Sequence, residues 1–427
     1  MIAFKLRLLF GTIAFVMAID GYLWQGIKRL LKDATATRKH RVKLIFWSVP
    51  AIFILGSLLY ILIPALEVNK LFRNYYMALL VITYLSKSIA LPFLFIDDIK
   101  RFFHWLLLRT GVIKSKLHAV SEGQVPGENK ISRSKFLTQA GIITGGVPFI
   151  MLTKGIVKGA YDYKLRRETL VLPHLPERFD GLKIIQISDI HSGSFFDKDA
   201  VKLGIDMIIQ QKADLIFFTG DMVNNVASEA VEYMDIFSHI KAPMGVYSTL
   251  GNHDYGDYVT SWESPEAKKK NLDDLCTIHK DLGWRLMRNE HETLSVHGQK
   301  IGLIGVENWG DRGRFQRLGD IDKAQQGMED VPVKLLLSHD PSHWDAVVRK
   351  EHKDIDVMFA GHTHGMQFGI EIGGFKWSPS QYMYKQWAGL YEEGKQRLYV
   401  NRGFGFIGYP GRVGILPEIT LFTLKKA

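Results

Sequence analysis

The sequence predicts an α/β domain preceded by a region of transmembrane helices. Two observations support this prediction. Several long apolar segments lie before residue 160, without amphipathic helices between them. After residue 160, short runs rich in Val, Ile, Leu and Phe alternate with segments of helical spacing, which is the pattern of an α/β fold. We therefore expect a transmembrane helical region over residues 1–160 and a single α/β domain over residues 161–427.

Composition limits the kinds of site that the chain can carry. The 427 residues include one cysteine, Cys276, which excludes an internal disulfide and a thiolate metal cage. The formal net charge is +10, and much of the excess lies upstream of Phe136, beside the apolar segments. This placement favours basic juxtamembrane loops over nucleic-acid binding. The second part shows no Lys/Arg stripe with interleaved aromatic residues, so we expect no nucleic-acid partner.

Four apolar segments are predicted to span the membrane. They are residues 8–24, 44–66, 75–96 and 136–157. Segment 44–66 is the clearest, because it is apolar throughout and a hydrocarbon core needs about 20 residues. A buried helical hairpin in a soluble protein is the alternative, and it fits several adjoining apolar segments poorly. Asp20 and Lys87 fall inside the spans, and we expect them either to pair within the bundle or to lie near an interface.

The loops between the spans set the expected orientation. The first and third loops are rich in Lys and Arg, whereas the second is short and mixed in charge. Basic loops stay on the cytoplasmic side. Four spans then make a multi-pass protein of the inner (cytoplasmic) membrane, with the α/β domain on the extracytoplasmic side. Lys5 and Arg7 argue weakly for the opposite orientation.

Five predicted strands of the α/β domain end in metal-type ligands. The ligands are Asp189 and His191 after 182–187, Asp221 after 215–219, Asn252 after 246–250, His339 after 333–338, and His362 and His364 after 357–360. Ligands in open α/β sheets gather at the carboxyl ends of strands. We therefore expect these side chains in one crevice, with His253 beside them. Imidazole and carboxylate suit Mn, Fe and Zn, and no thiolate demands a softer metal.

The remaining elements of the α/β domain follow from spacing and turn residues. Asp199 is placed to cap a helix over residues 200–211. Further helices are expected over 228–238, 272–282 and 343–350, and further strands over 161–172, 294–296, 301–306, 398–400 and 419–424.

The ordered ligand motifs resemble those of the calcineurin-like metallophosphoesterase superfamily. The motifs are Asp189-x-His191, Gly220-Asp221, Gly251-Asn252-His253-Asp254, His339 and Gly361-His362-x-His364. The chain is most similar to the membrane-associated bacterial branch, in which Gly-His-Thr-His-Gly precedes Gln367 and a later Asn-Arg-Gly-x-Gly, here Asn401–Gly405. The resemblance implies a four-layer α/β/β/α sandwich, in which two packed sheets are flanked by helices, and a centre of two divalent ions (Mn, Fe, Zn or Mg).

The superfamily pattern also implies a role for each ligand. It makes Asp221 the carboxylate that bridges the two ions. The first ion is completed by Asp189, His191 and His364, and the second by Asn252, His339 and His362. Two ions about 3.5–4 Å apart would hold a shared hydroxide and clamp the phosphoryl oxygens during in-line displacement.

Three residues beside the ligands are expected to assist them. His253 is left over from coordination and would donate a proton to the leaving oxygen or stabilise the transition state. Asp254 and Asp340 would orient neighbouring imidazoles.

The leading functional hypothesis is a membrane-anchored, metal-dependent phosphoesterase. Anchoring favours a lipid-linked phosphate or pyrophosphate substrate, with Arg402 as a candidate contact for substrate phosphate. The aromatic-rich stretch 377–391 would face the membrane interface or line an acyl or base pocket, with ordinary strand alternation as the alternative. One competing hypothesis is a phosphatase or nuclease acting on soluble substrates. Another is a non-catalytic membrane sensor or scaffold, against which the intact ligand set and His253 argue.

Overall fold

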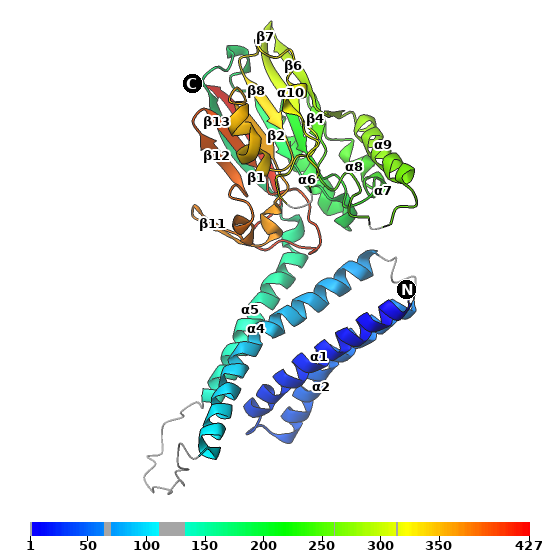
Figure 1. The fold of residues 1–427 in the computed structure, drawn as a ribbon, viewed down its shortest axis with the longest axis vertical. Helices are drawn as coiled ribbons and strands as arrows, with labels where there is room; N and C mark the ends of the chain where they lie inside the picture. The colour runs from blue at the N-terminus through cyan, green and yellow to red at the C-terminus, as the bar shows by residue number, and fades with distance from the viewer. Residues whose placement is uncertain (1, 64–69, 111–132, 260, 313–314) are drawn as a thin grey trace. The chain divides into compact units, whose positions relative to one another are not determined.

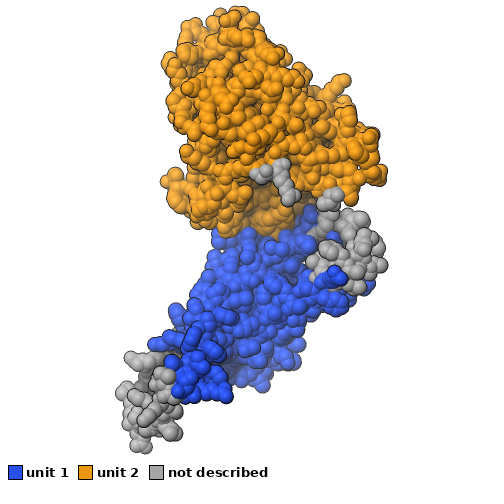
Figure 2. Space-filling model, viewed as in Figure 1, with its two compact units in different colours: residues 1–153 blue, residues 154–427 orange. Residues whose placement is uncertain are grey.

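The chain forms two compact units in the computed structural model, residues 1–153 and 154–427 (Figure 2). The structure describes residues 2–63, 70–110, 133–259, 261–312 and 315–427. The membrane-helix predictions fall in the first unit and the ligand motifs in the second, so each unit is described by itself.

The first unit is built from long helices (Figure 1). They are α1 (Ile2–Leu30), α2 (Ala36–Leu62), α4 (Lys70–Arg109) and α5 (Arg133–Val157), the last of which continues into the second unit. Within the described residues, three segments are long and apolar enough to cross a membrane, namely Ala36–Leu62, Asn74–Arg109 and Arg133–Val157. The predicted span 8–24 lies on α1, outside these three, so the count of four spans stays a prediction.

The two charges inside the predicted spans meet in the helical bundle. Asp20 is fully buried, and its Oδ1 lies 2.5 Å from the Nζ of Lys87. The hydroxyl of Tyr84 donates to Asp20 Oδ2 at 2.7 Å. Pairing removes much of the cost of a lone charge in an apolar environment, so the first of the two expected arrangements is the one observed.

The second unit contains two six-stranded sheets and a two-stranded hairpin. The first sheet contains, in spatial order, β1 (Lys164–Leu172), β14 (Glu418–Lys426), β2 (Lys183–Ile187), β3 (Leu215–Thr219), β4 (Val246–Thr249) and β5 (Arg285–Leu286). The second contains β12 (Gly389–Glu393), β13 (Gln396–Val400), β9 (Val357–Ala360), β8 (Lys334–Leu337), β7 (Gln299–Gly305) and β6 (Glu290–Val296). The hairpin consists of β10 (Ile370–Ile372) and β11 (Phe375–Trp377).

Side-chain alternation along the strands shows that the sheets pack face to face. Phe217 on β3 and Phe359 on β9 belong to one buried cluster between the sheets, with ring centroids 5.2 Å apart. Their neighbour Phe218 points to the opposite face of the first sheet, into the cluster formed with α6 (Lys198–Gln210) and α9 (Pro265–Asp281). Met358 points to the outer face of the second sheet. The predicted α/β/β/α order is therefore confirmed (Figure 1).

The short helices differ from the expected ones in detail. Asp197, rather than Asp199, caps α6, because its Oδ1 accepts from the Ala200 N–H at 2.9 Å. The helix expected over 228–238 is two short ones, α7 (Ser228–Val231) and α8 (Met234–Phe237), interrupted at the fully buried Tyr233. The helix expected over 343–350 is a π-helical turn, Trp344–Val348, followed by α11 (Arg349–Glu351). Between α9 and α11 the described chain also forms α10 (Ile321–Ala324).

We expect the second unit to lose stability in acid because His279 is buried without charge. His279 lies on α9 with Nδ1 3.0 Å from Ser248 Oγ, and burial lowers its pKa to about 3. An unfolded histidine has a pKa near 6.5, so the unfolded state binds the additional proton and stability falls as pH drops below about 6.5. The slope is at most about 1.4 kcal/mol per pH unit for this group.

The measurement is urea unfolding of the full chain in detergent at pH 7.5 and pH 5. His279→Leu should reduce the difference between the two unfolding free energies by about 2 kcal/mol. The exposed His297 provides the control, and His297→Leu should leave the difference unchanged. Equal pH dependence in all three proteins would show that His279 does not contribute.

Candidate metal centre

The strand order brings the predicted ligands to one edge of the sandwich. Neighbouring strands β2, β3 and β4 are parallel, so the residues that follow them lie at the same edge of the first sheet. Strands β8 and β9 are parallel in the second sheet. Gln186 on β2 joins the two sheets, because its Nε2 donates to the Ala360 carbonyl at the end of β9 at 2.9 Å. The carboxyl ends of strands from both sheets therefore meet, as ligand binding in such sheets requires.

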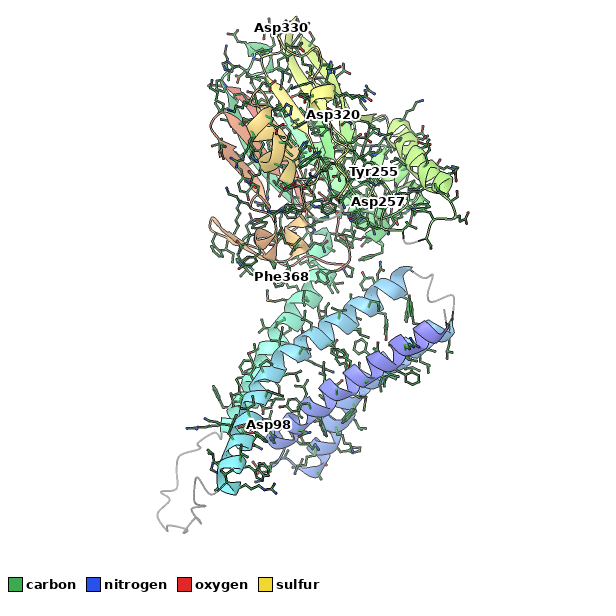
Figure 3. The ribbon with its side chains drawn as sticks, in the orientation of Figure 1. Asp98, Tyr255, Asp257, Asp320, Asp330 and Phe368 are labelled. Atoms are coloured by element: carbon green, nitrogen blue, oxygen red, sulfur yellow. The ribbon has the colours of Figure 1, made fainter. Side chains whose placement is uncertain are left out.

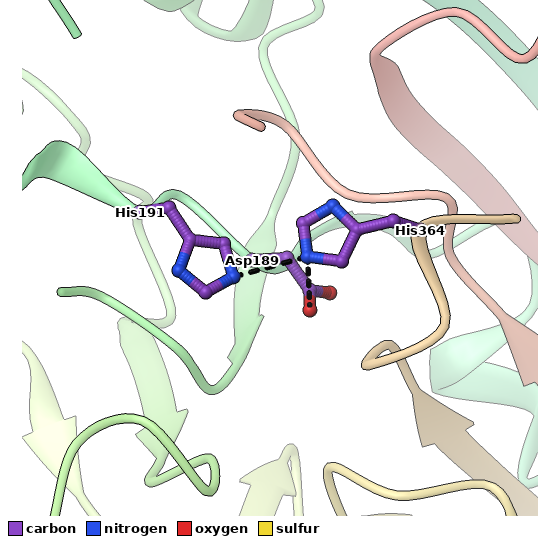
Figure 4. A group of neighbouring side chains, drawn as sticks. All are labelled: Asp189, His191 and His364. Carbon is purple, nitrogen blue, oxygen red and sulfur yellow. Dashed lines mark hydrogen bonds and ion pairs between the residues drawn. The ribbon is translucent and has the colours of Figure 1, made fainter. Parts of the chain in front are cut away.

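The first ligand group contains Asp189, His191 and His364 (Figure 4). The Nε2 atoms of His191 and His364 face one another at 3.0 Å, and His364 Nε2 lies 3.2 Å from Asp189 Oδ1. All three side chains are buried. Two imidazole nitrogens and a carboxylate oxygen within reach of one point form a typical site for a divalent ion.

The second ligand group contains Asp221, His339 and His362, and Asn252 joins it. The Nε2 of His339 lies 3.2 Å from Asp221 Oδ2 and 3.2 Å from Asn252 Oδ1. The Nδ1 of His362 lies 2.8 Å from the same Asn252 oxygen. The His339 ring is oriented by its other nitrogen, because Nδ1 donates to the Thr219 carbonyl at 2.7 Å and leaves Nε2 facing the group.

Asp221 faces both ligand groups with one oxygen. Its Oδ2 lies 3.2 Å from His339 Nε2 in the second group and 3.5 Å from His191 Nε2 in the first. Its other oxygen, Oδ1, accepts from the His253 N–H at 2.9 Å. This position is the one that a bridging carboxylate requires.

The backbone around the ligands is held in conformations that side chains rarely adopt. Of the ten non-glycine residues with positive φ in the described chain, five are predicted ligands. They are Asp189, His191, Asp221, His362 and His364. Such conformations cost of order 1–3 kcal/mol each and cluster at functional sites. Residue 361 must be glycine, because a Cβ at this position would lie 2.2 Å from Asp189 Oδ2.

The electrostatics of the centre suit a cation. Burial acts to lower the pKa of His339, but the Asp221 carboxylate outweighs it and raises the pKa to about 10. Burial lowers the pKa of His191 well below its usual value, so that ring is neutral and its lone pair is available. The Asp221 carboxylate thus attracts positive charge, and the neutral His191 ring offers a lone pair. The nitrogen and oxygen atoms of the two groups fit divalent ions.

His253 lies beside the two groups with a fixed tautomer. Its Nδ1 donates to the Asn224 carbonyl at 2.7 Å, which leaves Nε2 as the exchangeable position. Its ring stacks on Tyr258 with centroids 4.2 Å apart and meets the His191 ring edge-on at 4.9 Å. Tyr258 also accepts from Asn252 Nδ2 at 2.8 Å, so one tyrosine positions both residues.

Asp254 does not orient an imidazole, contrary to the sequence-based expectation. Its carboxylate accepts from the backbone N–H groups of Asp221, Met222 and Gly251 at 2.8–2.9 Å. Burial, followed by the Asp221 charge, raises its pKa to about 7 against the lowering effect of these bonds. Asp254 therefore ties together the loops that follow β3 and β4. The Oδ2 of Asp340 lies 3.6 Å from His362 Nε2, beyond hydrogen-bond distance, and the Tyr384 hydroxyl occupies that nitrogen at 2.7 Å, so an orienting role for Asp340 stays a prediction.

Arg402 is not placed to bind a substrate phosphate. Its side chain is 2% exposed, and its guanidinium contacts Glu418 Oε2 at 2.5 Å and Glu371 Oε1 at 2.8 Å. These carboxylates neutralise the cation inside the unit, so the expectation of a substrate contact is not supported by the position of this residue.

Two neighbours of the centre had no signal in the sequence. Arg412 is 1% exposed, and its Nη2 lies 3.1 Å from His364 Nδ1. Tyr258 belongs to the loop after the Asn252 motif, which also contains Tyr255 and Asp257 (Figure 3). Neither residue belongs to a spaced motif. Tyr384, which lies in the aromatic-rich stretch, places its hydroxyl 2.7 Å from His362 Nε2.

Comparison with known proteins supports the predicted class of each part of the chain. Residues 182–366 match the calcineurin-like phosphoesterase family, and residues 6–160 match a family described as a probable calcineurin-like phosphoesterase transmembrane domain. The uncharacterized metallophosphoesterase YkuE of Bacillus subtilis (strain 168) is 31% identical over 319 residues, which cover 70% of this chain and 99% of the relative.

Two further relatives are more distant. A transmembrane protein with metallophosphoesterase domain from Danio rerio is 26% identical, over 65% of this chain and 61% of the relative. The UDP-2,3-diacylglucosamine pyrophosphatase LpxG of Chlamydia trachomatis serovar D is 26% identical, over 56% of this chain and 84% of the relative.

The paired sheets and the two ligand groups at their common edge define a metal-dependent phosphohydrolase associated with the membrane. The chain belongs to the calcineurin-like metallophosphoesterases. The predicted superfamily and the predicted enzyme class are thereby confirmed.

Proposed function

We propose that the chain hydrolyses a phosphate ester or pyrophosphate bond of a lipid-linked substrate at a centre of two divalent ions. The observation that carries this proposal is the position of Asp221, whose Oδ2 faces both ligand groups. Bound ions would lower the pKa of a bound water towards about 7 and neutralise charge on the phosphoryl oxygens. The donor set admits Mn, Fe, Zn or Mg.

The residues of the chain have separate tasks in this proposal. The first ion is assigned to Asp189, His191 and His364, the second to Asn252, His339 and His362, and Asp221 is shared by both. The Nδ1–H of His253 is held by the Asn224 carbonyl, so Nε2 is the nitrogen that takes up and releases a proton, and it carries one when the ring is an imidazolium. It would protonate the leaving oxygen as the P–O bond breaks. Tyr258 keeps the ring in place by stacking on it.

The membrane part determines where this chemistry takes place. We assign residues 1–160 to a transmembrane region of four spans and residues 161–427 to the catalytic domain. The basic loops around residues 28–43 and 100–109 favour a cytoplasmic position for those loops. The catalytic domain would then lie on the extracytoplasmic side of the inner membrane.

An exposed apolar hairpin beside the centre supports a lipid-linked substrate. Strand β10 begins six residues after His364, and β11 completes the hairpin. The side chains of Ile372 and Phe375 in this hairpin are 75% and 61% exposed. A hydrogen bond links the end of the hairpin to the residue after His364, because Ser378 Oγ donates to the Gly365 carbonyl at 2.6 Å. Exposed apolar groups of this kind mark contact with a lipid or another apolar partner. The relation to LpxG, which is named for a diacylated nucleotide sugar, points to the same substrate class.

We expect the purified full-length protein, stripped of metal and supplied with Mn, to cleave UDP-2,3-diacylglucosamine in mixed micelles. The soluble control is UDP-N-acetylglucosamine, which contains the same type of pyrophosphate bond without the acyl chains. The kcat/KM for the acylated substrate should be at least about tenfold higher, since burying one large apolar group contributes about 1.5–3 kcal/mol.

The variant Ile372→Ser/Phe375→Ser should remove most of this preference and leave turnover of the soluble substrate unchanged. Leu203 on α6 and Val231 on α7 are 65% and 56% exposed, so Leu203→Ser/Val231→Ser is the matched control. Equal kcat/KM for the acylated and soluble substrates would reject the lipid-linked class but leave the phosphohydrolase intact.

A further inference from the structure

Two adjoining cavities of opposite character lie between the helices of the first unit. One is a basic pocket of about 920 Å³. The other is an apolar cavity of about 320 Å³. Both volumes suit part of a small ligand. Neither cavity includes a residue of the metal centre.

The basic pocket carries a strong excess of positive charge. Seven of its twelve lining residues are Lys or Arg, and one, Asp33, is acidic. Lys28 comes from the end of α1, Lys32 from the turn that follows it, and Lys39 and Lys43 from the start of α2. Within the described part of the chain, these four lysines form no ion pair with a carboxylate. Their charge is therefore available to an anion.

The arginines of the same pocket are already neutralised. Arg29 contacts Asp97 at 3.4 Å and Asp98 at 3.0 Å, and Arg101 contacts Asp97 at 2.7 Å (Figure 3). The Arg29 pairs join α1 to α4, the Arg101 pair lies within α4, and together they form one wall of the pocket. The four lysines are thus a distinct group without a carboxylate partner among the described residues, and one of them, Lys39, donates from Nζ to the Lys32 carbonyl at 2.8 Å.

The apolar cavity continues the basic pocket deeper into the bundle. On α5, Ser134 and Lys135 line the pocket, and Thr138 and Gly141, the next turn, line the cavity. The rings of Trp24, in the pocket, and Phe46, in the cavity, touch with centroids 5.2 Å apart. On each of the four helices the pocket is lined by basic residues and the cavity mainly by apolar ones, and the one charged residue of the cavity, Lys87, is paired with Asp20. A single elongated ligand can therefore occupy both spaces.

We propose that these two spaces form a binding site for one anionic phospholipid. Its headgroup phosphate lies among Lys28, Lys32, Lys39 and Lys43, and one acyl chain enters the apolar cavity. Basic pockets between membrane helices recognise acidic lipid headgroups in this way. The site is independent of the proposed hydrolysis, because it is formed by other residues at the N-terminal end of α5, whereas the catalytic domain follows its C-terminal end.

A general attraction between basic loops and an acidic membrane is the simpler alternative, and the chain offers a matched control for it. Lys39 and Lys43 line the pocket, whereas Arg38 and Arg41, on the same helix, do not. Each pair contributes two positive charges and is exposed. Removing either pair changes general attraction equally, but only the lysine pair belongs to the site.

The headgroup test measures binding of dioleoylphosphatidylglycerol to the full-length protein in dodecyl maltoside by native mass spectrometry. Dioleoylphosphatidylcholine is the zwitterionic comparison and should bind at least about tenfold more weakly. Lys39→Gln/Lys43→Gln should weaken binding of the anionic lipid at least about tenfold. Arg38→Gln/Arg41→Gln should leave the Kd within about twofold. Equal losses in the two double variants would overturn the proposal.

The acyl-chain test fills the cavity. Gly146 lines it, and a Cβ at this position meets nothing within 4 Å, so the first side-chain atom of Gly146→Leu is accommodated there. This variant should weaken binding of the anionic lipid about tenfold or more. Gly11 on α1 is equally open but lies outside the cavity, and Gly11→Leu should have no effect. Unchanged binding in Gly146→Leu, or displacement of the lipid by inorganic pyrophosphate at equal concentration, would show that no acyl chain is held there.

Discussion

Replacing Asp221 with asparagine is expected to abolish hydrolysis by the full-length protein. The carboxylate is 1% exposed, and its Oδ2 faces His339 at 3.2 Å and His191 at 3.5 Å. An amide has the same shape but no charge, so it cannot balance two divalent ions. We expect kcat/KM to fall at least about a thousandfold, which corresponds to losing about 4 kcal/mol of charge stabilisation in the transition state.

Metal content should fall together with activity in this variant. Elemental analysis after dialysis should find two ions per chain in the unmodified protein and fewer than two in Asp221→Asn. The φ of 61° at Asp221 is a conformation that asparagine tolerates, so the fold should survive. Asp330, an exposed residue of the same unit, gives the control Asp330→Asn (Figure 3). A variant that keeps both ions and full turnover would remove Asp221 from the proposed bridging position.

Replacing His253 with glutamine is expected to slow the reaction without removing metal. His253 contacts the Asn224 carbonyl, Tyr258 and His191, and its Nε2 is free to exchange a proton. Loss of a general acid lowers kcat by about 10²–10⁴. The loss should be smaller for a p-nitrophenyl ester, because p-nitrophenolate leaves without a proton, and larger for an alkyl ester.

This dependence on the leaving group separates proton donation from a merely structural role. His291 on β6 is also half-buried, and its Nδ1 lies 2.7 Å from the Ala324 carbonyl, so His291→Gln repeats the same loss of a hydrogen bond away from the centre. That variant should retain kcat within about twofold. If His253→Gln slows both esters equally, His253 positions the ligands rather than protonating the leaving group.

Motifs that fit within one strand and its following turn were predictable. Asp189 and His191 directly follow β2, and His362 and His364 directly follow β9, so strand, turn and ligand can be recognised together. The core of two packed sheets was expected from the resemblance to the superfamily, which these same motifs carry. The cap of α6 and the interruption at Tyr233 were missed, because they depend on which side chains the sheet buries.

Long-range contacts lay beyond any local pattern. Arg402 has the same chemistry as a phosphate-binding arginine, but its partners Glu418 and Glu371 are distant in sequence and neutralise it. Asp254 was expected to orient an imidazole and instead accepts from four backbone N–H groups of two loops. In both cases the sequence showed a residue of the right chemical type, but it did not show which groups that residue contacts.

The sequence by itself determined the family, the candidate ligands and the presence of apolar helices that precede the catalytic domain, because each of these is expressed by neighbouring residues. Only the tertiary structure decided that His191 and His364, 173 residues apart, face one another at 3.0 Å. It likewise decided that lysines on α1 and α2 line a basic pocket that continues into an apolar cavity. Both features exist because packing brings separate elements together, and the free energy of that packing depends on all of the contacting side chains at once.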